Sequence, residues 1–308
     1  MLDSTVVGKE NFDFSISKDE MLLNNNLTSK SIKSKHSNDQ IPRPFVKWVG
    51  GKRQLLSTLN AAAPKTFKHY YEPFIGGGAF MFSMLPRDIT ISDMNGELIN
   101  CYQVIKDDVQ GLIRSLKTHK NTEDHFYDVR AKDLSKLTKV QRASRFIFLN
   151  KTCFNGLYRE NKSGQFNTPF GRYAKPNIVD IENLLAIHDY LNMVNISIHH
   201  RGYEHVLNEA QYGDFVYFDP PYAPLTKTAN FAAYVKGGFN DDNQAQLANA
   251  FKALSARGVN VMLSNSNAQL IHDLYAGFKI EIIHATRAIN CKGGSRGKKA
   301  NEVLITNY

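Results

Sequence analysis

The most constraining feature of this sequence is the apolar run Phe215–Phe218, which ends directly in Asp219-Pro220-Pro221-Tyr222. Four apolar residues in a row predict a parallel strand that is buried on both faces of its sheet. The two prolines cannot extend that strand, and they hold the following turn in one conformation. Because ligands bind at the carboxyl ends of strands in open α/β sheets, this tetrapeptide lies where a site is expected. A rigid strand-to-loop turn is the alternative interpretation.

The rest of the chain fits a doubly wound α/β fold. From Phe45 onward, short apolar runs alternate with amphipathic stretches. Strands are expected at 70–74, 89–92, 259–263 and 302–307, and a helix that packs on the sheet is expected at 243–254. Between 106 and 176 the pattern changes to helical segments rich in Lys and Arg, followed by a hairpin punctuated by Gly and Asn. Residues 1–43 are rich in Ser, Asn and Lys and predict a disordered extension.

The tetrapeptide suits chemistry on the exocyclic amine of an aromatic base. Such an amine is a poor nucleophile because its lone pair is delocalised into the ring. The Asp219 carboxylate and the Pro220 carbonyl can accept its two N–H bonds and turn the lone pair toward an electrophile. Tyr222 offers a face on which a base flipped out of a duplex can stack. This chemistry requires neither a metal nor a covalent intermediate.

A second candidate feature is the glycine-rich turn E-P-F-I-G-G-G at 72–78. Its three glycines let the backbone approach a ligand closely, and Asp93, after the next expected strand, can accept hydrogen bonds from a ribose diol. Each has a structural alternative, a tight turn for the glycines and a strand-end turn former or helix cap for Asp93. Together they predict a nucleoside-bearing cofactor. In F-V-K-W-V-G-G-K at 45–52, Trp48 alone would be interpreted as a core residue and Lys52 as a surface lysine.

Composition adds a charge argument and a compartment argument. Lys plus Arg number 38 against 29 for Asp plus Glu, and residues 1–43 carry six of each sign, so the net charge of +9 lies in the remainder. A basic folded body suits a polyanion such as nucleic acid. Cys101, Cys153 and Cys291 are far apart and form no C-x-x-C, which favours a reducing compartment over disulfides or zinc. With no apolar run of about 20 residues and no signal peptide, the chain is expected to be cytoplasmic.

Together these motifs resemble the Dam family of class α DNA adenine methyltransferases over about residues 45–308. The order F-V-K-W-V-G-G-K, E-P-F-I-G-G-G, insert, D-P-P-Y is the family's order, and the likeness is closest to GATC methyltransferases of restriction–modification systems. The segments F-N-G-L-Y-R at 154–159 and Q-F-N-T-P-F-G-R-Y at 165–173 resemble its recognition hairpin. The resemblance implies a Rossmann-like, AdoMet-dependent methyltransferase domain at 44–105 and 177–308. It also implies a mainly helical target-recognition insert with a β-hairpin at 106–176.

The family's residue roles carry over to matching positions. The resemblance implies contacts with S-adenosyl-L-methionine at Trp48, Lys52, Phe74, Gly76, Asp93 and Asp219. It implies adenine binding and catalysis at Asp219, Pro220, Pro221 and Tyr222. It implies contacts with the GATC bases at Lys47, Leu157, Arg159, Pro169 and Tyr173. The chemistry of Arg159 agrees, since a guanidinium can bond guanine O6 and N7 together, although a phosphate contact is the alternative. Tyr158 has no role that its chemistry assigns.

The expected function is therefore transfer of a methyl group from S-adenosyl-L-methionine to N6 of adenine in double-stranded GATC, by base flipping and in-line displacement. Double-stranded DNA is the expected partner, and a cognate restriction endonuclease that acts separately on the same site is a further one. No metal or membrane is expected. One alternative is an N4-cytosine methyltransferase, whose motif usually begins with Ser where this chain has Asp219. The other is a DNA-binding regulator that has lost catalysis.

Two further segments have a functional and a plain interpretation. Residues 226–240 could close over the flipped adenine, or could form a surface loop without a role. Lys292, Arg296, Lys298 and Lys299 suit phosphate contacts or a solvated basic turn.

Overall fold

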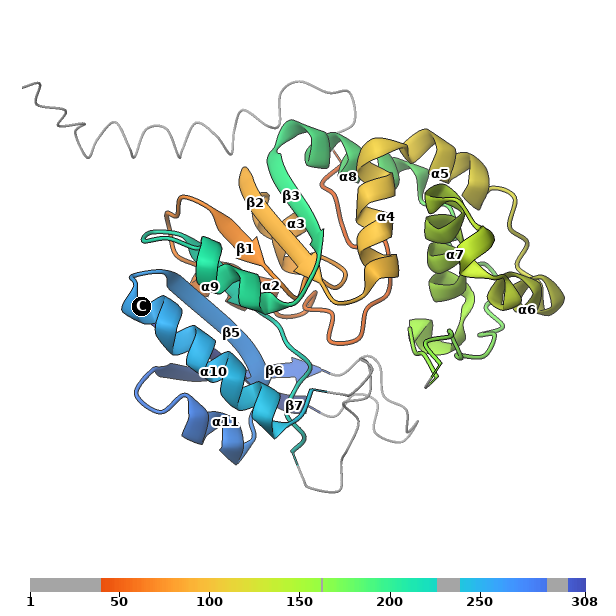
Figure 1. Cartoon of the computed structure of the whole chain (residues 1–308). Coiled ribbons are helices and arrows are strands. Elements are labelled where there is room, and N and C mark those ends of the chain that lie inside the picture. The colour runs from red at the N-terminus through yellow and green to blue at the C-terminus, as the bar shows by residue number, and fades with distance from the viewer. Residues whose placement is uncertain (1–39, 162, 226–238, 287–298) are drawn as a thin grey trace, which may run out of the picture. The chain divides into compact units, whose positions relative to one another are not determined.

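A computed structural model describes residues 40–161, 163–225, 239–286 and 299–308. Within the compact unit that begins at Gln40, these residues include one seven-stranded sheet with the order β3-β2-β1-β4-β5-β7-β6 (Figure 1). Neighbours from β3 to β5 are parallel, and β7 is antiparallel to both β5 and β6. The strands are β1 (Tyr70–Glu72), β2 (Asp88–Asp93), β3 (Asn195–His200), β4 (Phe215–Phe218), β5 (Asn260–Ser266), β6 (Lys279–Thr286) and β7 (Lys299–Thr306). The α/β fold predicted from the sequence is confirmed.

The described residues include helices that cover both faces of this sheet and, between residues 109 and 152, helices that pack mainly on other helices (Figure 1). They are α2 (Leu56–Ala62), α3 (Ala79–Met84), α4 (Gly96–Asp107), α5 (Val109–Leu116), α6 (Glu123–Ala131), α7 (Lys139–Thr152), α8 (Ile181–Met193), α9 (Val206–Glu209), α10 (Asp241–Ala256) and α11 (Gln269–Leu274). None of them is long and apolar enough to cross a membrane.

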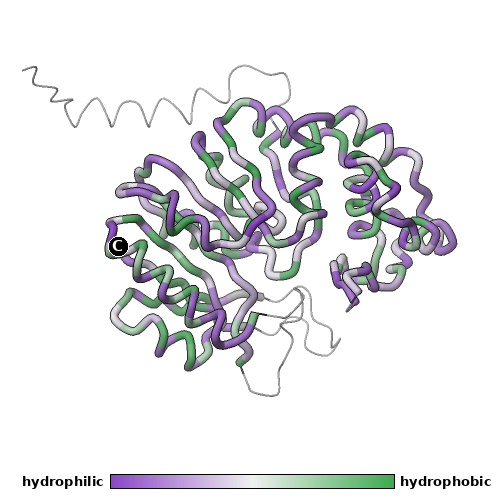
Figure 2. Tube along the Cα trace, in the orientation of Figure 1, coloured by the Kyte–Doolittle hydropathy of each residue, from purple (hydrophilic) through white to green (hydrophobic). Residues whose placement is uncertain are grey.

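Alternate residues of the central strands divide the core in two. Phe215 and Tyr217 pack with α3, α4 and α8 on one face, whereas Val216 and Phe218 pack with α10 and α11 on the other. All four side chains are fully buried, as expected of a parallel strand covered on both sides. Hydrophobic and hydrophilic residues alternate along the covering helices, because one side of each helix faces the sheet (Figure 2).

The strand predictions hold at the centre of the sheet and fail toward its edges. β1 ends at Glu72 rather than residue 74, because Pro73 has no N–H to continue the ladder. The edge strands β3 and β6 were not predicted. β3 reads N-I-S-I-H-H and is half-buried or exposed along its whole length, so it lacks the apolar run of a central strand.

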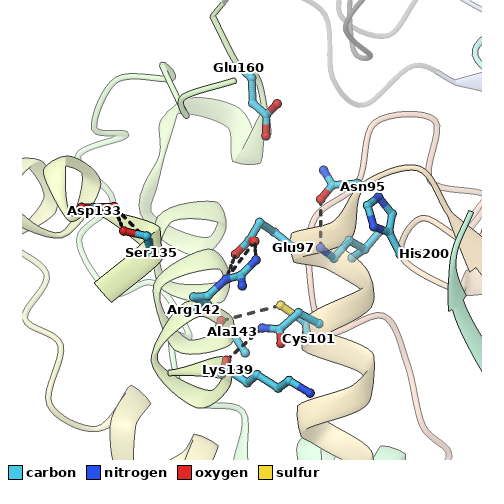
Figure 3. Close-up of polar contacts among 12 residues, drawn as sticks. Asn95, Glu97, Cys101, Asp133, Ser135, Lys139, Arg142, Ala143, Glu160 and His200 are labelled. Carbon is cyan, nitrogen blue, oxygen red and sulfur yellow. Dashed lines mark hydrogen bonds and ion pairs between the residues drawn. The ribbon is translucent and has the colours of Figure 1, made fainter. Parts of the chain in front are cut away.

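Helices α4 to α8 occupy the connection between β2 and β3. Arg142 of α7 forms an ion pair with Glu97 of α4, and the Cys101 thiol donates to the Ala143 carbonyl at 3.8 Å (Figure 3). After α7 the chain forms the predicted hairpin, with bridges between Cys153 and Phe170 and between Glu160 and Phe166. Arg142 and Glu97 therefore tie the helix that leads into the hairpin to a helix that covers the sheet. The domain boundaries at 106 and 176 stay predictions.

Several expectations concern undescribed residues. The extension up to residue 39, most of the 226–240 loop, and Lys292, Arg296 and Lys298 lie outside the described residues.

Candidate active site

The candidate site lies where the sheet order reverses. β1 pairs with β2 on one side and with β4 on the other. From β1 the chain adds β2 and β3 toward one edge of the sheet, and from β4 it adds β5 toward the other edge. The glycine-rich turn follows β1 and Asp219 follows β4. Their carboxyl ends are therefore neighbours at the switch point, which is where open α/β sheets bind ligands.

Asp93 holds the glycine-rich turn in place. Its Oδ2 accepts the Gly76 N–H at 3.0 Å, and its Oδ1 accepts the Asn95 N–H at 2.9 Å. Burial raises the pKa of the Asp93 carboxyl. The helix cap of α4 is the Asn95 side chain, which accepts the Leu98 N–H, so Asp93 is not the cap, whereas its bond to the Asn95 N–H fits a turn former at the end of β2. A carboxylate has about four acceptor sites, so Asp93 keeps acceptor capacity for a ligand beside these backbone bonds.

Trp48 closes the other side of this turn. Gly76 has φ +48°, and a Cβ atom there would lie 2.6 Å from Trp48 Cδ1. Trp48 also stacks on Tyr158 of the hairpin, with ring centroids 6.0 Å apart. Tyr158, which sequence reasoning could not assign, thus joins the hairpin to the tryptophan. The Phe74 ring, next to the glycines of this turn, stacks on the Tyr203 ring with ring centroids 5.6 Å apart.

Lys52 and Asp219 form the charged centre of the site. Lys52 Nζ lies 2.7 Å from Asp219 Oδ1 and donates to the Gly50 carbonyl at 2.8 Å. The Lys52 side chain is only 4% exposed and that of Asp219 20%. Burial raises the pKa of Asp219 to about 6, against the lowering effect of Lys52. Lys52 is therefore a partner of the D-P-P-Y motif and not a surface lysine.

Tyr222 is oriented by a residue that sequence reasoning missed. Its hydroxyl donates to Glu302 Oε2 of β7 at 2.8 Å, and Lys52 Nζ lies 4.8 Å from its ring centroid. A tyrosine hydroxyl has one proton, so Tyr222 cannot also donate to Asp219. Asp219 Oδ1 is paired with Lys52 Nζ at 2.7 Å, and among the described residues no second partner with hydrogen-bond geometry reaches it. It is a buried acceptor that a bound amine can use.

A network of buried amide side chains holds the loop that follows β4. The Gln244 amide donates to the Pro221 carbonyl at 2.9 Å, and Asn265 accepts the Ala223 N–H at 3.0 Å while donating to Gln244 at 3.0 Å. Both side chains are fully buried. Since two of these bonds fix loop backbone and the third joins the two amide side chains, the network holds Asp219 and Tyr222 in one arrangement.

Glu72, the last residue of β1, carries a second buried carboxyl group. Burial raises the pKa of Glu72 to about 8, although the Tyr70 hydroxyl donates to it at 2.7 Å. Glu72 therefore holds its proton at neutral pH, which leaves Asp219 as the charged carboxylate of the pair. Among the residues that the structure describes, no three His, Cys, Asp or Glu side chains gather as a metal site would require.

The expected base-contacting residues gather around the hairpin. Lys47 Nζ lies 4.4 Å from the Tyr173 ring centroid. Arg159 is exposed, and its Nε donates to the Asn167 side chain at 2.9 Å. The carbonyls of Leu157 and Pro169 accept from Thr168 Oγ1 at 2.6 Å and from the Phe154 N–H at 2.8 Å, and so hold the two sides of the hairpin together.

The fold and this site define a class of protein. It is a Rossmann-like transferase in which the D-P-P-Y motif lies beside a glycine-rich turn. The comparisons with known proteins agree. Residues 48–289 match the model of the D12 class N6 adenine-specific DNA methyltransferases. The chain belongs to this family, and it is an adenine-N6 DNA methyltransferase. Methyltransferases of this kind generally use S-adenosyl-L-methionine, and the family acts on DNA. The N4-cytosine alternative is thereby excluded.

The alignments with named relatives cover most of this chain and nearly all of each relative. The type II methyltransferase M1.LlaDCHI of Lactococcus lactis subsp. cremoris is 46% identical over 272 residues, which are 86% of this chain and 95% of that protein. The type II methyltransferase M.MjaIII of Methanocaldococcus jannaschii is 43% identical over 288 residues, 86% of this chain and 99% of that protein. The DNA adenine methylase of Escherichia coli K12 is 34% identical over 266 residues, 85% of this chain and 94% of that protein.

The Lys52–Asp219 ion pair leads us to expect a specific pH dependence of kcat/KM. An ionised carboxylate accepts hydrogen bonds more strongly, so kcat/KM should fall as the pH drops through about 6, the pKa of Asp219. Lys52 lowers that pKa, so Lys52→Met should move the acid limb to higher pH. The measurement is kcat/KM against pH with both substrates below KM. An acid limb at the same pH in both enzymes would contradict the role of the pair.

Proposed function

We propose that this chain transfers the methyl group of S-adenosyl-L-methionine to N6 of adenine in double-stranded GATC, with the adenine flipped into the site. The observation that carries the proposal is the meeting of Asp219, Lys52 and Tyr222 beside the glycine-rich turn at the switch point. In this proposal residues 44–105 and 177–308 form the catalytic domain, and residues 106–176 form the target-recognition insert.

The residues present fit this cofactor. A nucleoside with a sulfonium centre needs acceptors for its diol, an apolar ring surface and a nearby negative charge. Asp93 supplies the acceptors, Trp48 the ring surface and Asp219 the negative charge. They surround the glycine-rich turn, where Trp48 leaves no room for a side chain at position 76. We assign cofactor binding to Trp48, Lys52, Phe74, Gly76, Asp93 and Asp219. When bound, the cofactor supplies an electrophilic methyl group.

The protein's part in the reaction is to present the amine. Asp219, whose carboxylate keeps acceptor capacity beside its Lys52 ion pair, takes one N–H of the adenine amine, and the Pro220 carbonyl takes the other. Tyr222, fixed through Glu302, is the surface on which the flipped base stacks. The Gln244–Asn265 network keeps Pro221 and Ala223 from moving, so little reorganisation is needed at the moment of transfer.

The GATC assignment rests on the resemblance of the hairpin to the family's recognition hairpin. Lys47, Leu157, Arg159, Pro169 and Tyr173 are proposed to contact the bases. Relatives at 46% and 43% identity are named type II methyltransferases, which supports a cognate restriction endonuclease that acts separately on the same site.

Replacing Arg159 tests whether the hairpin contacts specific bases. Arg159→Ala should reduce the preference for GATC over a duplex changed at one base pair by about tenfold, because a guanidinium–guanine contact is lost. The measurement is kcat/KM on a panel of single-change duplexes. Arg172→Ala is the matched control, since Arg172 is an exposed arginine at the end of the same hairpin segment whose guanidinium is paired with Glu123 of α6. If Arg159→Ala weakens all duplexes equally, Arg159 contacts phosphate instead.

A further inference from the structure

Two buried asparagines hold the segment that leads into the site in the same way. Asn183 of α8 accepts the Arg43 N–H and donates to the Arg43 carbonyl, both at 3.0 Å. Asn150 of α7 accepts the Lys47 N–H and donates to the Lys47 carbonyl, both at 2.8 Å. Both asparagine side chains are fully buried. Each amide thus bonds both the N–H and the carbonyl of one residue, as a neighbouring strand would.

Asn150 differs from Asn183 by one bond. Its Nδ2 also donates to the Gly156 carbonyl at 3.2 Å, at the turn between α7 and the hairpin. Gly156 has φ +66°, and a Cβ atom there would lie 2.5 Å from Lys47 Cδ. Lys47 and the start of the hairpin therefore lie in direct contact, and one amide group bonds both.

The two segments that Asn150 joins carry the proposed base contacts. Lys47 contacts the Tyr173 ring, and Leu157 and Arg159 follow Gly156 directly in the chain. Asn150 itself has no exposed surface with which to touch DNA. Displacements of about 1 Å are enough to spoil a site built from separate elements.

We propose that Asn150 is a positioning residue for sequence recognition, which fixes Lys47 relative to the hairpin so that both read the DNA as one rigid unit. This inference rests on the proposed function, because it takes Lys47 and Arg159 as base contacts. It assigns specificity to a side chain that does not contact the bases.

The test is Asn150→Asp, which keeps the size of the side chain. The acceptor for the Lys47 N–H remains, but both N–H donors are lost and a carboxyl oxygen faces the carbonyls of Lys47 and Gly156. The quantity measured is kcat/KM at the preferred site divided by kcat/KM at single-change duplexes. We expect this ratio to fall by about tenfold, the worth of one lost base contact. Asn150→Ser, which cannot span both carbonyls and adds no charge, should show the same fall if the aspartate variant does not fold.

Asn183→Asp is the matched control. It makes the same isosteric change in an equally buried clamp on the same segment, but Asn183 has no bond to the hairpin among the described residues. We expect a comparable loss of thermal stability and a ratio within about twofold of wild type. An unchanged ratio in both Asn150 variants would overturn the inference, and so would an equal fall in Asn183→Asp.

The same assay separates this inference from the proposed function. If Lys47→Ala and Arg159→Ala leave the ratio unchanged, the proposed base contacts are wrong. If those two variants lower the ratio and the Asn150 variants do not, the base contacts stand and only the role of Asn150 is wrong.

Discussion

Replacing Asp219 with alanine is expected to lower the rate of methyl transfer by about 10³-fold. The change removes the buried acceptor for the adenine amine. It also leaves Lys52, whose side chain is 4% exposed, without its 2.7 Å counterion. Because a buried charge without a partner is costly, the variant should also lose about 3 kcal/mol of stability. Transfer should therefore be measured per folded molecule, with labelled cofactor and single-turnover conditions.

Asp214 supplies the control for this prediction. It is a buried carboxylate at the opposite end of β4, where it accepts the Gln211 N–H at 2.8 Å and the His69 N–H at 3.2 Å. Asp214→Ala should reduce stability but keep the rate of transfer per folded molecule. An Asp219→Ala enzyme with near wild-type transfer would exclude the proposed catalytic role.

Gly76→Ala is expected to weaken cofactor binding by at least about tenfold. The added methyl group would lie 2.6 Å from Trp48 Cδ1 and 2.8 Å from Nε1, at a backbone φ of +48°. Trp48 would have to leave the turn that Asp93 also holds. Trp48 is the single tryptophan of the chain, so its fluorescence reports on this position directly during titration with S-adenosyl-L-methionine.

Gly277→Ala separates steric overlap from backbone strain. Gly277 has φ +94°, and a Cβ atom there would have no neighbour within 4 Å. The control variant therefore bears the cost of an unfavourable φ without a clash, and should bind the cofactor as wild type does. Equal affinities in wild type and Gly76→Ala would show that the cofactor does not depend on the Trp48–Gly76 contact.

The sequence predicted those parts of the site that are contiguous in the chain. Asp219 to Tyr222 follow a fully apolar strand, so both the strand and the position of the motif at its end could be inferred. The partners of that motif could not be inferred from local pattern. Glu302 lies 80 residues after Tyr222 and bonds it only because β7 inserts beside β5.

Buried amides are the hardest functional residues to predict. Asn150, Gln244 and Asn265 each bond backbone 20 or more residues away, at separations of 103, 23 and 42. An asparagine or glutamine inside an amphipathic helix looks like a surface residue until its partners are known. Edge strands were missed for a related reason, since β3 buries too little of its surface to show an apolar run.

The most direct test of the central claim is transfer of labelled methyl from S-adenosyl-L-methionine to matched duplexes that contain GATC or a scrambled site, with the modified base identified by mass spectrometry. The account predicts N6-methyladenine in the GATC duplex alone. N6-methyladenine in another site would contradict the interpretation of the hairpin, and DNA binding without transfer would contradict the enzymatic assignment and favour a regulator.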